Sequence, residues 1–162
     1  QGKARILFNR EVVIDWSPVR DGDQLEKLIA AAEAKLKRGE IPVELLREAL
    51  EMAYENARRG RSSPRVPMPD LYKAFRVALV QRELKSGNPD KKLVWAECPR
   101  WAFLYNLDRY RQLGSTAGEE RLTFETGSQQ DQVNGLGMTL NGLSPEQEYK
   151  VCCWVLKSEH RA

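Results

Sequence analysis

Positive charge and aromatic rings are concentrated in the middle third of this chain, between residues 61 and 114. That stretch has 11 Lys/Arg against 5 Asp/Glu, whereas the part before it has 11 against 11 and the tail has 4 against 7. It also holds seven of the 13 Phe, Trp and Tyr residues. Cationic side chains attract phosphate and flat rings stack on bases, so this combination favours a nucleic-acid-binding surface.

The candidate residues for that surface are cations in and just before the basic stretch, together with two rings expected to stack on a base. They are Arg58, Arg59, Arg61, Arg65, Lys73, Arg76, Lys91, Lys92, Arg100, Arg109 and Arg111, with the rings of Trp101 and Tyr105. We expect DNA or RNA as the partner and an affinity that falls steeply with salt. The competing interpretation places both rings in the core, covered by arginine stems.

No catalytic motif stands out in the sequence. The single histidine, His160, lies near the end of the chain, where a rigid general base is hard to build. Asp108 and the pair Glu119 and Glu120 are carboxylates that a magnesium-dependent nuclease could use, but no spacing singles them out. We therefore expect a protein without catalytic residues, metal or cofactor.

Three cysteines, Cys98, Cys152 and Cys153, occur without a Cys-x-x-Cys pair. This spacing does not suit a zinc site, and adjacent cysteines rarely bond to each other. We expect reduced, buried thiols in an intracellular, cytoplasmic protein. The longest apolar run, residues 151–156, is too short to cross a membrane, so no membrane partner is expected.

The first sixty residues predict a strand or hairpin followed by two helices. Short β-prone runs at 6–8 and 12–14 form the strand or hairpin. Apolar residues at helical spacing predict an amphipathic helix over 23–38, and Pro42 begins a second one. Because three or four residues separate the two helices, we expect them to pack antiparallel as a helical hairpin.

An Arg/Pro-rich linker at 61–69 precedes helices predicted at 70–85 and 98–113. The 70–85 helix has two apolar stripes on opposite sides. One is expected to face the core, and the second consists of Val77, Val80 and Leu84. A helix that is apolar on two sides is either sandwiched in a fold or open to a partner, so this stripe is the candidate partner-binding site.

The tail changes to β-type patterns. Alternation at 122–126 and the return run 138–140, joined by a polar loop, predict a β-ribbon placed like the wing of a winged-helix fold. Residues 140–151 resemble a loop and strand of a fibronectin type III domain, but 144–147 also form a helix-capping pattern. We favour a helix over 145–160, because the mostly helical pattern before it does not suit a sandwich of strands.

The predicted fold is α+β and mainly helical. It has four or five helices, including the N-terminal helical hairpin, a short N-terminal strand or hairpin, and a small late β-ribbon. Residues 1–60, the 61–69 linker and 70–162 are expected to form one domain. The preferred function is a non-catalytic nucleic-acid-binding factor in replication, regulation or packaging. The alternative is an adaptor or viral structural component that binds a protein or another copy of itself.

Overall fold

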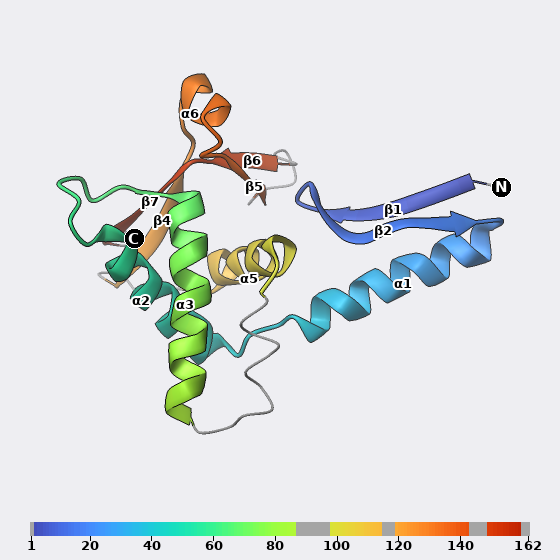
Figure 1. Cartoon of the computed structure of the whole chain (residues 1–162), viewed down its shortest axis with the longest axis horizontal. Helices are drawn as coiled ribbons and strands as arrows, with labels where there is room; N and C mark the ends of the chain where they lie inside the picture. The colour runs from blue at the N-terminus through green and yellow to red at the C-terminus, as the bar shows by residue number, and fades with distance from the viewer. Residues whose placement is uncertain (1, 87–97, 115–118, 143–148, 160–162) are drawn as a thin grey trace.

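The computed structural model describes residues 2–86, 98–114, 119–142 and 149–159. Helices and antiparallel strands are both present, so the α+β class is confirmed. Figure 1 shows a body formed by α2, α3, α5 and the late strands, from which an arm of β1, β2 and α1 extends to one side.

The arm begins with a β-hairpin, as the sequence predicts. Strands β1 (Gly2–Phe8) and β2 (Glu11–Val19) pair antiparallel. The turn between them places Asn9 at φ 48° and Arg10 at φ 68°, as a two-residue type I′ turn requires. This turn lies at the body, and the opposite end of the hairpin points away from it (Figure 1).

Helix α1 (Gly22–Arg38) follows, capped by the Asp21 side chain, which accepts a hydrogen bond of 2.9 Å from the Gln24 amide. The helix packs along β1 and β2, and Ala32 is its buried residue. Helix α2 (Val43–Arg58) packs instead against α3. The predicted helical hairpin of α1 and α2 is therefore wrong: the apolar stripe of α1 is covered by the β-hairpin, a non-local contact that spacing alone does not reveal.

Three helices build the core of the body. Helices α2 and α3 (Met68–Ser86) pack against each other, and α5 (Arg100–Gln112) lies beside α3 at a large angle, on the side of the arm (Figure 1). Their bounds agree with the helices expected at 70–85 and 98–113. The largest fully buried side chains come mostly from these helices and include Leu46, Leu50, Tyr54, Leu71, Phe75, Leu79, Phe103, Leu104 and Leu107.

Two small sheets complete the body. Strands β3 (Val66–Pro67), β7 (Trp154–Glu159) and β4 (Glu120–Glu125) form an antiparallel sheet in the order β3-β7-β4. Strands β5 (Met138–Asn141) and β6 (Tyr149–Cys152) pair separately, and the short helix α6 (Gln129–Val133) lies between β4 and β5.

This arrangement corrects two expectations about the tail. The segment predicted to be a C-terminal helix contains β6 and β7, because Val155 pairs with both Val66 and Phe124 and makes β7 the central strand of its sheet. The predicted ribbon also has different partners: β4 pairs with β7, and β5 pairs with β6. Long-range pairing has overridden a local capping pattern.

Candidate interaction surfaces

The predicted stacking ring of Tyr105 lies where the arm meets the body. Its hydroxyl donates a hydrogen bond of 2.6 Å to Glu40, just beyond the end of α1. The ring of Phe8, at the hairpin turn, packs edge-on against it with centroids 5.5 Å apart. Burial, followed by the hydrogen bond to Glu40, raises the pKa of Tyr105 to about 12. The ring is therefore engaged in holding the arm.

Trp101, the second predicted stacking ring, packs against the same junction. It is half-buried, and a Cβ added to Gly39 would lie 3.1 Å from its ring. The ammonium of Lys35, in the last turn of α1, is 5.5 Å from the ring centroid, as in a cation–π contact. Trp101 thus supports the C-terminal end of α1.

The arginines of α5 are bound to groups of the chain itself. Arg100 pairs with Glu11 of β2 at 2.8 Å. Arg109 donates to the carbonyl oxygen of Ile41 at 2.8 Å and lies 4.0 Å from Glu40. Arg111 donates to Asp108 and to the carbonyl of Asn141. These three cations connect α5 to the arm, to the 39–41 connector and to β5.

Two buried polar residues of α5, neither predicted as a connector, complete this junction. The Asn106 side chain is fully buried, accepts from the Ile41 amide at 2.9 Å, and donates to the Gly39 carbonyl at 2.8 Å. Asp108 accepts from the Asn9 amide group at 2.6 Å, and burial raises its pKa although the adjacent Arg111 opposes this shift. The available sequence signal was Asn106, a polar residue inside the otherwise apolar and aromatic run 101–107.

Four more of the predicted cations lie at the other end of the body, around the loop between α2 and α3. Arg61 pairs with Asp70 at 2.5 Å, and Arg65 pairs with Glu125 at 3.0 Å. Arg58 and Arg59 are exposed, and in the described part of the chain neither has a carboxylate within ion-pair distance.

Two other members of the predicted set lie on α3. Lys73 is 3.8 Å from Asp70, and Arg76 lies 5.8 Å from the ring centroid of Tyr72. Lys91 and Lys92 fall outside the described residues. The predicted nucleic-acid set is thus divided between α5, at the arm, and the α2–α3 loop with the adjoining turns of α3.

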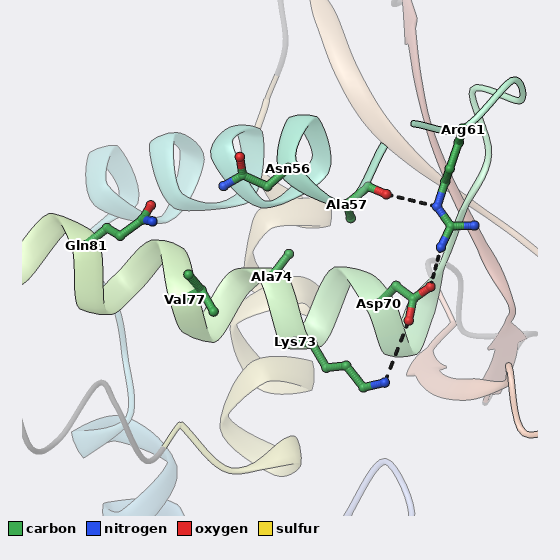
Figure 2. Close-up of a pocket in the computed structure, with 8 residues that line it drawn as sticks. All are labelled: Asn56, Ala57, Arg61, Asp70, Lys73, Ala74, Val77 and Gln81. Carbon is green, nitrogen blue, oxygen red and sulfur yellow. Dashed lines mark hydrogen bonds and ion pairs between the residues drawn. The ribbon is translucent and has the colours of Figure 1, made fainter. Parts of the chain in front are cut away.

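An open groove of about 560 Å³ runs between α2 and α3 (Figure 2). Apolar side chains of Ala57, Ala74 and Val77 line its middle, and Arg61 and Lys73 both turn toward Asp70 at one end. Val77, from the predicted partner-binding stripe, is 52% exposed here.

The other two residues of the predicted partner-binding stripe differ from Val77. Val80 is half-buried, and the side chain of Leu84 lies outside the described residues. Among the described side chains of the stripe, Val77, at its N-terminal end, therefore lines the groove.

Among the described residues, most of the exposed large apolar side chains lie on the arm. Along β1, the side chains at positions 3, 5 and 7 are exposed and those at 4, 6 and 8 are half-buried, so the strand has an outer and an inner face. Leu7 pairs directly with Val12, and Arg5 lies 5.0 Å from the ring centroid of Trp16. We call this side the outer face of the arm; its residues are Lys3, Arg5, Leu7, Val12, Trp16 and Pro18.

The outer face was not predicted. Its indole, Trp16, is 58% exposed, and Leu7 and Val12 are 45% and 41% exposed. The register of β1 and β2 explains why the exposed face is not evident in the sequence. Strand β2 has two irregularities: one lies opposite the step from Ala4 to Ile6 of β1, and the next lies opposite the step from Ile6 to Leu7. Each irregularity adds a residue to β2 and breaks the strict alternation by which a face is recognised.

Comparison with known proteins adds no family. No protein-family model, curated protein or solved structure matches this chain. None of the helices that the structure describes has the length and apolar character needed to cross a membrane. The described residues also contain no cluster of three or more His, Cys, Asp or Glu side chains arranged to hold a metal ion.

Proposed function

We propose that this chain is a protein-interaction and assembly module, and that the outer face of its arm docks a protein partner. The observation that carries the proposal is the exposure of Trp16, Leu7 and Val12 together on one face of a hairpin. Clustered apolar side chains exposed on a surface mark interaction sites more often than isolated ones do.

The chemistry of the outer face supports a protein partner. Trp and Arg are the residue types most enriched among those that dominate binding energy at protein interfaces, and Trp16 and Arg5 lie in contact. In the described part of the chain, five of the seven large exposed apolar side chains belong to the arm. They are Leu7, Val12, Trp16, Leu25 and Ile29.

The junction supports the same proposal because it fixes the arm in one orientation. The Asn9 side chain bonds to Asp108, Glu11 pairs with Arg100, and Glu40 accepts from Tyr105. Several bonds across one junction restrict rigid-body motion of the arm. A docking element that is already oriented loses less entropy when it binds.

Site-specific photo-crosslinking tests the proposal. A benzophenone amino acid replaces Trp16 in one variant and Val133 in a control variant, and both proteins are irradiated in the cells that produce them. Val133 is 74% exposed on α6, in the body. We expect adducts of defined mass from position 16 that are absent from position 133. The same set of adducts from both positions, or none from position 16, would refute the proposal.

Nucleic-acid binding is retained as a second candidate because of the exposed cations near the end of α2. Arg58 and Arg59 are available to phosphate, and the order of elements from α2 to β7, with strands β3-β7-β4, resembles a winged-helix domain. The test is the anisotropy of a labelled duplex and a labelled single strand from about 50 to 300 mM salt. Binding that weakens with salt and with Arg58→Ala plus Arg59→Ala supports it; salt-independent binding, or none, rejects it.

A further inference from the structure

The two outer edges of the arm's sheet differ in what they offer to another chain. A two-stranded sheet leaves a row of unpaired backbone N–H and C=O groups on each outer edge, and such edges readily accept another strand. A hairpin is also marginal alone and gains stability from a third strand.

The β2 edge is obstructed. Both register irregularities add their extra residue to β2. The ammonium of Lys35 donates to the Val13 carbonyl at 2.7 Å, and the Trp16 amide is bonded to the Asp15 carboxylate at 2.8 Å. Pro18 has no backbone N–H to offer. Bulges, side-chain bonds and proline are the features by which proteins close a sheet edge.

The β1 edge has none of these features. Its seven residues, Gly2–Phe8, include no proline, and its exposed and half-buried positions alternate regularly from Lys3 onward. Within the described residues, no hydrogen bond joins the β1 backbone to any segment other than β2. The backbone of β1 is therefore the open edge of the arm.

We propose that β1 accepts an extended strand from a different protein, and that this strand alternates acidic and apolar side chains. The proposal rests on the proposed function and specifies the chemistry of the partner. Strand addition obtains affinity from main-chain hydrogen bonds and specificity from alternate side chains. The side chains that neighbour the added strand therefore define its sequence pattern.

Charge on the outer side of β1 selects carboxylates. Side chains of an added strand that point outward lie beside Lys3, Arg5 and Leu7, because neighbouring strands keep their faces in common. Lys3 and Arg5 are both exposed, and neither has an ion-pair partner among the described residues. On the inner side the neighbours are Ala4 and Ile6, which favour apolar side chains.

The same charges disfavour a second copy of this chain. Two β1 strands paired antiparallel about a two-fold axis would carry Lys3 and Arg5 of both copies on the same side of the joined sheet. Like charges on neighbouring strands repel each other. Charge complementarity therefore points to a distinct, acidic partner.

Anisotropy titrations with labelled peptides test the inference. The probe is a short peptide that alternates glutamate and valine, and its counterpart replaces glutamate with lysine. Two further glutamate peptides carry N-methyl groups on alternate backbone nitrogens, in opposite phases. Only one phase removes the N–H groups that would face β1, because N–H groups of successive residues point to opposite edges of a strand.

The protein variants form a matched pair. Lys3→Glu with Arg5→Glu reverses the charge beside β1, whereas Arg58→Glu with Arg59→Glu makes the same change in net charge on exposed residues of the body. We expect the glutamate peptide to bind at least about tenfold more tightly than the lysine peptide. We also expect the affinity for the glutamate peptide to fall at least about tenfold in the Lys3/Arg5 variant, and one N-methyl peptide to bind at least about tenfold more weakly than the unmethylated one. The Arg58/Arg59 variant and the other N-methyl peptide should show little change in affinity.

Three outcomes would overturn the inference: no binding of the glutamate peptide, equal binding of both peptides, or equal loss for both N-methyl phases. Crosslinking from position 16 distinguishes a failure of strand addition from a failure of the proposed docking function. A partner crosslinked at Trp16 together with a negative peptide titration rejects strand addition alone. Absence of specific adducts at Trp16 rejects the docking function itself.

Discussion

Replacing Asn106 by alanine should destabilise the fold through the connector between arm and body. The side chain is fully buried and makes bonds in both directions: it accepts from the Ile41 amide and donates to the carbonyls of Gly39 and Ala102. Alanine leaves the Ile41 amide, on a residue with no exposed surface, without its partner. It also removes the bond to the Gly39 carbonyl.

The magnitude follows from the number of groups left without a partner. A buried donor or acceptor that loses its hydrogen bond costs about 1–3 kcal/mol. The Ile41 amide and the Gly39 carbonyl together therefore give a loss of about 2–6 kcal/mol of unfolding free energy, with the lower end expected because Gly39 is half-buried and its carbonyl can be partly hydrated. Ala102 adds little, since it lies within the helix and its carbonyl keeps other interactions. For a chain of this size, each 1 kcal/mol shifts the Tm by about 2–4 °C.

Chemical denaturation followed by circular dichroism measures this loss, and amide hydrogen exchange locates it. We expect exchange of the Ile41 amide to accelerate more than exchange within α3. The matched control is Asn134→Ala, which removes an exposed asparagine at the end of α6 and should change stability by less than about 0.5 kcal/mol. If Asn106→Ala stayed within about 1 kcal/mol of the wild type, the connector role would be refuted.

Three further predictions concern individual residues. Because the pKa of Tyr105 is raised to about 12 in the folded chain, its contribution to the unfolding free energy is full below the ordinary tyrosine pKa of 10.0 and is lost as pH rises through about 12. Tyr105→Phe should remove this loss of unfolding free energy at high pH, measured by urea titration, and should remove one late-titrating phenol from the ultraviolet titration. An alanine at position 127 would place its Cβ 2.6 Å from Cys153, so Gly127→Ala should cost about 1–3 kcal/mol in thermal unfolding, and a neutral result would contradict the packing described. Burial raises the pKa of Cys98 to about 12, so this thiol should not react with a thiol reagent until the protein unfolds; rapid labelling of native Cys98 at neutral pH would contradict that environment.

Helices α1, α2, α3 and α5 were predictable because each one carries a local signal, whereas α6 lies in the segment that was expected to be a polar loop. Apolar spacing and the C-terminal cations and glycine located α1, and Pro42 located the start of α2. Pairing between distant segments carries no comparable signal. Val155 pairs with Val66 and with Phe124, which are far away in the sequence, so that β7 is the central strand of its sheet. This long-range pairing outweighs the helix-like local pattern at 145–160.

The candidate site illustrates the same limit. Trp101 and Tyr105 were correctly placed on one helix, but composition does not reveal that Lys35 and Glu40 contact them. Trp16 lies beyond the β-prone run at 12–14, in the part of β2 that continues to Val19, and the bulges of β2 disrupt the alternation that marks a face. Charge counts located the cations, whereas their ion pairs depend on the tertiary fold.

The affinity of the partner crosslinked at position 16 provides the most direct measurement of the docking account. Isothermal titration would compare wild type, Trp16→Ala and Val133→Ala, both of which replace exposed side chains outside the core. An interface residue that dominates binding loses at least about 2 kcal/mol on truncation, which is about thirtyfold in Kd. The account predicts that loss for Trp16→Ala and none for Val133→Ala; equal affinities of all three proteins would contradict it.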